Sequence, residues 1–485
     1  MLDKYIKTKR FTYIYTAVLF LISAYIMLIG WDDFDSLGHV IVNQQLYIGI
    51  QILVLITSAM LVLSSRLTDA MLPAMMLAVI ATACYNSADK FLTPEFLWVA
   101  FPVVFSVIFH FVKYKGTFKV GRSFWGVCAV ALAVTVGGLG SISAADYFSG
   151  TSLFYVFGLG IGMVIFYLLV KSQIDSDSPE NVARVMYMTG MLAAFSIYWL
   201  YIFQWDLFKS MGRILEPQFG NNLSTILMMA IPFAFYYATK RCVDFVSVII
   251  MYGAMMLSGS RGGIVMGTIE IGILLVLFSI FYQKGIAGIV NRVTYIGLIL
   301  GTTLAIWYFL PEIAILGNLV EDPNISRWGV IEMLLTLTSN QNEVRARLIQ
   351  RMIVDFESNP IFGVGIGYTG NVDLYNPVKG AMNWYHMWIP QIVGSLGVVG
   401  IAAYGYQLFE RVRMTLKNSS AVLFTFFMSY VGLWLMSQLN PGEFCPAPYL
   451  MLAVTYFAFI EKKEDDIPLF KKKKKSEKEA AAVQE

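Results

Sequence analysis

The chain has 485 residues, of which 57% are hydrophobic and 14% are charged, and its formal net charge is +3. Soluble domains carry about 25% charged residues, so the composition excludes an ordinary soluble protein and indicates one that crosses a membrane many times. The four cysteines have no paired spacing, which excludes a disulfide framework and a zinc motif. With only three histidines, we expect no metal site, and nothing indicates a cofactor.

Fourteen apolar runs approach the roughly 20 residues that a helix needs to cross a bilayer. The sequence therefore predicts an all-α polytopic membrane domain over residues 1–461, with about 12–14 transmembrane helices. The runs at 70–85 and 447–460 are short and are expected to be tilted or re-entrant. The candidate spans are 11–30, 46–64, 70–85, 95–112, 123–140, 151–171, 183–203, 222–239, 242–258, 264–282, 293–310, 387–408, 420–438 and 447–460.

Basic residues in the short loops predict the orientation. The first span follows several basic residues but continues to Gly30 without a small-residue cleavage site, so we expect a retained anchor with a cytoplasmic N-terminus. Most loop lysines and arginines then fall inside, and the C-terminus is cytoplasmic too. Residues 462–485 form a basic tail that we expect to be disordered and to lie near anionic lipid. The short outer loops hold only Lys90, Lys209, Arg213 and Arg261.

Residues 311–386 form the one large polar loop, and this topology places it outside the cell. Within it, residues 343–357 carry apolar side chains at helical spacing, which predicts an amphipathic helix that begins near Asn340 and ends before Pro360. Such a helix, with its arginines beside the apolar stripe, can lie on the outer membrane face. The stripe is Leu348, Ile349, Met352, Ile353 and Phe356, and the arginines are Arg345, Arg347 and Arg351.

Arg261 lies in the segment Leu257-Ser258-Gly259-Ser260-Arg261-Gly262-Gly263, at the outer end of a predicted span. Burying its charge in lipid is costly, so this arginine has to reach water, a cavity or an anion. The small residues around it leave room for a bulky ligand and allow tight turns. The alternative is an interfacial arginine that reaches lipid phosphate, and we favour the ligand.

Arg213 is a second outer cation, followed by Gly220-Asn221-Asn222 at the start of the next predicted span. Asparagine at such a position is an ordinary helix N-cap. Structural and ligand-binding roles for Arg213 both stay open.

The string Asn359-Pro360-Ile361-Phe362-Gly363-Val364-Gly365-Ile366-Gly367 predicts irregular backbone after the amphipathic helix. Its glycines, Gly363, Gly365 and Gly367, would let the backbone approach a large headgroup. Residues 365–370 formally match a dinucleotide-binding fingerprint, but they have no preceding strand or following helix, so we reject that match.

His386 stands at the end of the loop, next to Trp384, Tyr385 and Trp388. Its ordinary pKa of about 6.5 suits a general base near neutral pH. The alternative is a histidine within an interfacial aromatic belt. Glu270 is the clearest ionisable residue inside a predicted span, where it is expected to pair with a neighbouring helix; one such residue does not define an ion path.

Taken in order, these motifs resemble the bacterial O-antigen ligase and Wzy-type polymerase family over about the second half of the chain. The resemblance runs from Gly212-Arg213 and Gly220-Asn221-Asn222 through Ser258–Gly263 and Arg345 to Asn359–Gly367, His386 and Gly397-Val398-Val399-Gly400. The family pattern often has Asn, Ser or Gln after the histidine, where this chain has Met387.

The resemblance implies glycosyl transfer at the outer face of the bacterial cytoplasmic (inner) membrane. The donor would be a glycan on undecaprenyl pyrophosphate, and the acceptor a sugar hydroxyl. Arg261 and Arg345 would clamp the diphosphate, which fits a metal-independent, inverting reaction, and His386 would orient or deprotonate the acceptor. Partners would be membrane lipids and other polysaccharide assembly proteins, with no nucleic acid. Residues assigned to substrate binding are Arg213, Asn222, Ser260, Arg347, Gly363, Gly365 and Gly367.

We expect a polymerase that joins repeat units of O-antigen, capsule or exopolysaccharide. A ligase that transfers the glycan to a lipid or protein acceptor is the alternative within this class. A lipid-linked oligosaccharide flippase is the alternative from another class, but it would keep polar groups along a midplane cavity, whereas here they gather at one face.

Overall fold

The structure of the protein is a computed structural model. The described residues are 9–29, 31–34, 40–42, 44–64, 104, 107–108, 110–112, 115–144, 156–174, 178–203, 217–258, 260–281, 293, 296–297, 300–301, 304–305, 307–312, 324–330, 339–366, 385–418, 420–439, 444, 455–461 and 467–468. The predicted span 70–85, Arg213 and Gly367 lie outside them, as do most of span 95–112, parts of spans 293–310 and 447–460, and nearly all of the tail 462–485.

The described part of the chain is mostly helical, as predicted, and its long helices overlap predicted spans, except for Ser339–Ser358, which lies in the predicted loop. An apolar run of this length favours a helix because the helix pairs backbone groups within the segment itself. The helices are α2 (Lys9–Ile29), α3 (Gln44–Ser64), α7 (Phe124–Ala144), α9 (Met163–Gln173), α10 (Ser178–Phe203), α12 (Pro217–Lys240), α13 (Phe245–Leu257), α14 (Arg261–Phe281), α18 (Ser339–Ser358), α19 (Trp388–Asn418), α20 (Ala421–Ser437) and α22 (Thr455–Ile460). A π-helical turn, η3 (Gly158–Gly162), precedes α9, and a 3-10 turn, η4 (Cys242–Asp244), precedes α13.

Two short antiparallel sheets depart from the all-α prediction. Strand β1 (Trp31–Phe34) pairs with β2 (Val40–Val42) directly after α2. Strand β3 (Lys119–Val120) pairs with β4 (Ile467–Pro468), so this piece of the tail, which we predicted to be disordered, lies beside the chain that leads into α7. Strands of two to four residues are too short to give a hydrophobic alternation from which a strand could be predicted.

Among the described residues, two helices are long and apolar enough to cross a membrane, Pro179–Phe203 and Trp388–Lys417. Shorter apolar helices accompany them, and these features are compatible with a membrane protein. The shorter helices are Tyr13–Ile26, Tyr47–Thr57, Phe124–Leu139, Gly158–Ser172, Phe245–Leu257, Gly262–Phe278 and Ala421–Ser437.

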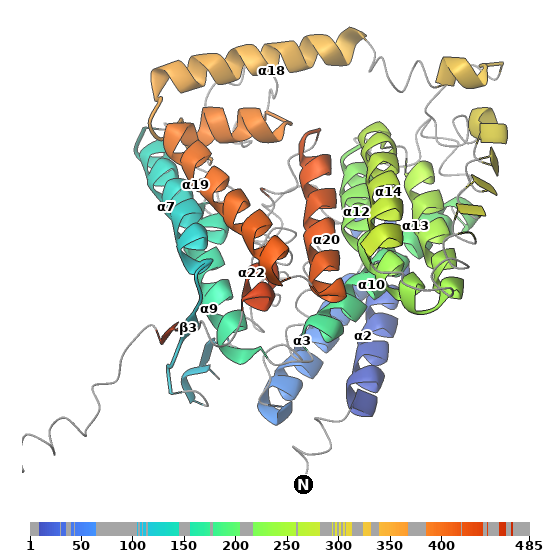
Figure 1. The fold of residues 1–485 in the computed structure, drawn as a ribbon, viewed down its shortest axis with the longest axis horizontal. Coiled ribbons are helices and arrows are strands. Elements are labelled where there is room, and N and C mark those ends of the chain that lie inside the picture. The colour runs from blue at the N-terminus through green and yellow to red at the C-terminus, as the bar shows by residue number, and fades with distance from the viewer. Residues whose placement is uncertain are drawn as a thin grey trace, which may run out of the picture.

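Helix α12 is the centre of one group of helices, because it packs against α10, α13, α14 and α20. A second group is built on α19, which packs against α7 and α18. Helix α20 contacts both groups. Figure 1 shows α18 lying across one end of the bundle, whereas β3 and the start of α2 lie at the other. We refer to these as the α18 end and the β3 end.

The predicted amphipathic helix is present as α18, which ends at Ser358, just before Pro360. Its buried face differs in part from the predicted stripe. Leu348 is buried, but the other buried side chains are Arg351 and Asp355, whereas Ile349 and Ile353 are exposed. The physical reason is the pairing of Arg351 with Asp355 and of Asp355 with a distant tyrosine, described below.

Helix α19 is broken near its start. Gly397 has φ 59° and ψ −155°, a conformation essentially restricted to glycine, and the first segment of α19 lies across the bundle before the chain turns down along it (Figure 1). The turn after α18 inserts at this break. Val398 N donates to Pro360 O at 2.9 Å, and Gly365 N donates to Ser395 O at 2.9 Å. The inserted turn therefore supplies hydrogen-bond partners that the broken helix lacks.

Candidate functional site

The serine-rich segment before α14 is tied to the start of α12. Ser260 Oγ donates to Asn221 Oδ1 at 2.6 Å and accepts from Gly263 N at 3.1 Å. The hydroxyls of Ser224 and Ser258 lie 2.8 Å apart. All three serines are buried. These contacts bring together the residues around Asn221 and Ser260, two segments that are distant in the sequence.

Small residues here are required by packing. A β-carbon at Gly263 would lie 2.5 Å from Cβ of Ser224, so a larger residue would force α12 and α14 apart. The predicted need for small residues is therefore explained by helix contact, whatever else they accommodate.

Two helix N-termini meet at this point. Arg261 is the first residue of α14, and α12 begins at Pro217, one turn before Asn221. Because the N-terminal amides of a helix carry partial positive charge, two such ends side by side favour an anion. Asn222 is partly buried on the same turn of α12. Arg213 and the side chain of Arg261 lie outside the described residues.

The second part of the site joins α18 to the start of α19. Arg351 and Asp355 form a buried two-pronged ion pair, with Nη2–Oδ1 at 2.7 Å and Nε–Oδ2 at 2.8 Å. The hydroxyl of Tyr385 donates to Asp355 Oδ2, while Tyr385 N donates to Gln391 Oε1 at 3.0 Å. Tyr385 is therefore held at both its backbone and its side chain.

His386 follows Tyr385 directly and has φ 53°, in the left-handed region that non-glycine residues rarely adopt. Such conformations persist only where neighbouring contacts fix them, and they gather at functional sites. His386 is partly buried. The contacts of Tyr385 with α18 and α19 restrain the backbone on the N-terminal side of His386.

The two parts of the site meet at the C-terminal end of α20. Trp388, two residues after His386, packs edge-on against Trp434 with ring centroids 6.0 Å apart. Leu439, about one and a half turns further along, lies against α14, where a β-carbon at Gly262 would be 3.0 Å from Leu439 Cδ1. The segment at His386 and the start of α14 thus flank the same end of α20.

The predicted ligand-binding glycines have a packing role. Gly363 and Gly365 are buried, and a β-carbon at Gly363 would lie 2.6 Å from the carbonyl oxygen of Gly394. Backbone therefore approaches backbone here, as glycine permits. A contact of these residues with a ligand stays a prediction. On α18, Arg347 is exposed, and the side chain of Arg345 lies outside the described residues.

Asp355 and Gln391 are site residues that sequence reasoning missed, and Arg351 was noted only as a cation beside the apolar stripe. The i, i+4 spacing of Arg351 and Asp355 was a usable signal for an ion pair. Nothing local indicates that this pair faces inward, because its partner Tyr385 is 30 residues away.

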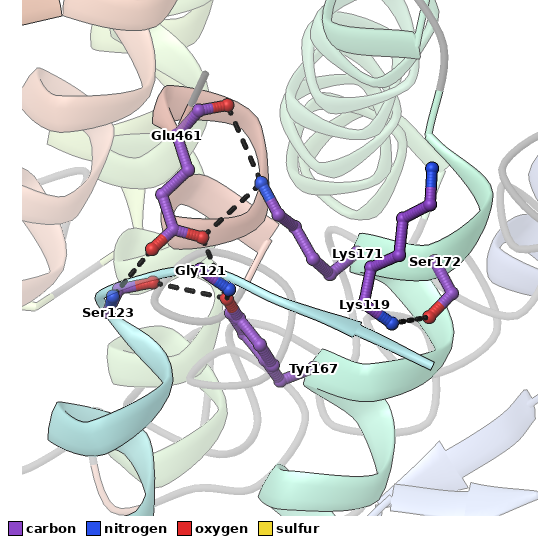
Figure 2. Close-up of polar contacts among 7 residues, drawn as sticks. All are labelled: Lys119, Gly121, Ser123, Tyr167, Lys171, Ser172 and Glu461. Carbon is purple, nitrogen blue, oxygen red and sulfur yellow. Dashed lines mark hydrogen bonds and ion pairs between the residues drawn. The ribbon is translucent and has the colours of Figure 1, made fainter. Parts of the chain in front are cut away.

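A separate buried polar cluster lies at the β3 end (Figure 2). Lys171 of α9 and Glu461, directly after α22, form an ion pair at 3.4 Å with both side chains almost fully buried. Tyr167 donates to Glu461 Oε2 at 2.7 Å and accepts from Gly121 N at 3.1 Å, and Ser123 N donates to Glu461 Oε1. The carboxylate thereby connects α9, the start of α7 and the end of α22. This satisfied cluster has a structural role.

No family model, curated protein or solved structure matches this chain. The resemblance described above therefore rests on its motifs, and the activity is a proposal.

Proposed function

We propose that the protein is a membrane glycosyltransferase that polymerises undecaprenyl-pyrophosphate-linked repeat units into a surface polysaccharide. One observation carries the proposal: the left-handed His386 and the helix end that begins with Arg261 flank the same end of α20. A general base and an anion-binding helix end at one place are what transfer from a lipid diphosphate requires.

In the proposed reaction, the oxygen of an acceptor sugar hydroxyl attacks the anomeric carbon of the donor glycan. The bond from that carbon to the diphosphate oxygen breaks with inversion, and the electron pair leaves with the diphosphate. His386 takes the proton of the hydroxyl. Arg261 and Arg345, with the N-terminal amides of α12 and α14, stabilise the charge that develops on the leaving group. Arg213, Asn222, Ser260 and Arg347 complete the proposed binding surface.

The proposed setting is the bacterial inner membrane, with the α18 end outside and both termini inside. Helices α12 and α14 both begin at the α18 end. This agrees with the proposed orientation, in which the loop that carries α18 and the first residues of these two helices lie on the same side of the membrane. Cysteine accessibility at Gln350, exposed on α18, tests this orientation from outside intact cells.

The test of the activity is turnover by purified protein in detergent with a defined undecaprenyl-pyrophosphate oligosaccharide. We expect longer lipid-linked chains from the wild type. Arg261→Ala is expected to reduce the rate by about 10²–10³-fold. Arg241→Ala is the matched control, because Arg241 is exposed and lies at the far end of α12 in an ion pair with Asp244.

For His386 the informative substitution is asparagine. Asparagine tolerates left-handed backbone, so His386→Asn removes the base without adding strain. We expect a loss of about 10²–10⁴-fold at an unchanged melting temperature. Wild-type turnover in this variant would exclude the general-base role. Transfer to a free lipid or protein acceptor without chain growth would make the protein a ligase, and translocation of the donor without any product would make it a flippase.

A further inference from the structure

Glu270 is a buried carboxyl group in the interior of the bundle. It lies on α14, nine residues after Arg261, and its side chain is fully buried. Among the described residues, neither carboxyl oxygen has a hydrogen-bond donor. Among the same residues, no lysine or arginine forms an ion pair with it. A buried carboxylate with no donor and no cation is strongly disfavoured.

A backbone acceptor without its usual donor faces the same point. Pro232 lies inside α12 and has no N–H, so the carbonyl of Met228, four residues earlier, cannot receive its normal helical hydrogen bond. In an apolar setting such a carbonyl has to find a donor on a neighbouring helix.

Gly432 of α20 shows that these two groups lie close to one point. A β-carbon at Gly432 would lie 2.8 Å from Cδ of Glu270 and 2.9 Å from the carbonyl oxygen of Met228. The carboxyl group and the carbonyl thus share the space left by a missing side chain. Close by, the hydroxyl of Ser429 on α20 donates to the carbonyl of Met229, so α20 also contacts the adjacent carbonyl in the turn that precedes Pro232.

We propose that Glu270 is a proton-binding site, and that its protonated carboxyl group donates a hydrogen bond to the carbonyl of Met228. The proton supplies the donor that Pro232 removes and leaves no net charge in the interior. One bound proton would then join α12, α14 and α20, whose ends form the candidate site.

A metal cation fits this place less well than a proton. Helices α12, α13 and α20 contain one charged residue, Lys240, at the last position of α12. Their titratable side chains are otherwise Tyr236, Tyr237, Tyr252 and Tyr430. Ser429 is already engaged, and a hard cation such as Ca²⁺ takes six to eight oxygen ligands, far more than one carboxyl group and one carbonyl supply.

The first test is infrared spectroscopy of the full-length protein in detergent. We expect the wild type to show the C=O stretch of a protonated buried carboxyl group, and Glu270→Gln to lack that band. Glu270→Gln is expected to melt close to the wild type, because its amide can donate to Met228. If no band is lost, Glu270 is ionised and the proposal is wrong. The same holds if Na⁺ or K⁺ raises the melting temperature of the wild type but not of Glu270→Gln, since the site would then bind a cation.

The second test is a double-mutant cycle with Pro232→Ala, which restores an N–H for the Met228 carbonyl. Glu270→Ala is expected to lower the melting temperature clearly in the wild-type background and much less in the Pro232→Ala background. Equal shifts in both backgrounds would overturn the hydrogen bond to Met228. Neither test measures glycosyl transfer, so the proposal stands or falls independently of the proposed function.

Discussion

The hydroxyl of Tyr385 donates a hydrogen bond to Asp355, which connects the residue before His386 to helix α18. Asp355 is already paired with Arg351, so the tyrosine completes a buried network that spans two elements 30 residues apart. The position of His386 therefore depends on α18 as well as on α19, whose Gln391 accepts from Tyr385 N.

Tyr385→Phe should destabilise the protein by about 1.5–3 kcal/mol, because it removes a hydrogen bond to a buried charged group. Transfer activity should fall with it, since the backbone of His386 loses a restraint. Thermal unfolding in detergent measures the first effect and the turnover assay the second. Tyr406→Phe is the control, because Tyr406 lies on α19, the helix that follows Tyr385, and is partly exposed. Equal effects of the two substitutions would show that Tyr385 has no specific role in positioning His386.

Arg351→Met should destabilise by about 3–5 kcal/mol, because it leaves the buried Asp355 carboxylate without this guanidinium group. The double variant Arg351→Met with Asp355→Leu should recover part of that loss, since it removes the charge as well. Gln350→Ala, an exposed neighbour on α18, should change the free energy of unfolding by less than about 0.5 kcal/mol. A double variant no more stable than Arg351→Met alone would show that the pair is not the source of the effect.

Sequence reasoning predicted the existence of the long helices and of α18, because both depend on local patterns of apolar spacing and on Pro360. It did not predict which side of α18 is buried. The apolar stripe was expected to lie on a membrane face, and its Ile349 and Ile353 are exposed on the protein, whereas Arg351 and Asp355 are buried because a tertiary partner compensates their polarity. Hydrophobic periodicity carries no information about such a partner.

In the candidate site, too, the sequence indicated some features and not others. The motif order named the segments around Asn221 and Ser260 but did not predict the hydrogen bond that joins them. It gave no sign that Gly363 and Gly365 pack on the break in α19, because Gly397 reads as an ordinary glycine in an apolar run until the inserted turn is seen.

Gly397→Ala should be destabilising by about 1–3 kcal/mol from backbone strain alone, because its backbone conformation is nearly restricted to glycine. A β-carbon would also lie 2.5 Å from the carbonyl oxygen of Pro360, which is backbone and cannot turn away. Gly405→Ala is the matched control on the same helix, with no atom within 4 Å of the new carbon. That variant should be neutral or stabilised by up to about 1 kcal/mol. The difference between the two melting temperatures is the measurement, and similar values would contradict the break at Gly397.

The pair Lys171–Glu461 allows a comparison of buried and exposed ion pairs within one protein. Lys171→Met should destabilise by about 3–5 kcal/mol, since the Glu461 carboxylate stays buried without this ammonium group. The control is Lys240→Met, which breaks a pair with Glu180 whose side chains are 47% and 35% exposed, and it should change stability by less than about 1 kcal/mol. Burial lowers the pKa of Lys240, but its hydrogen bonds and charge interactions with Glu180 and Tyr236 together raise that pKa above its ordinary value, so Lys240 stays charged near neutral pH.

Adding Glu461→Gln to Lys171→Met should restore part of the lost stability, because the amide oxygen still accepts from Ser123 while the charge is gone. Recovery should be incomplete, since the Tyr167 hydroxyl donates to a weaker acceptor. The wild type, Lys171→Met, Glu461→Gln and the double variant form one double-mutant cycle of unfolding free energies. If Lys171→Met and Lys240→Met lowered stability equally, the buried cluster at the β3 end would not hold α9, the start of α7 and the end of α22 together.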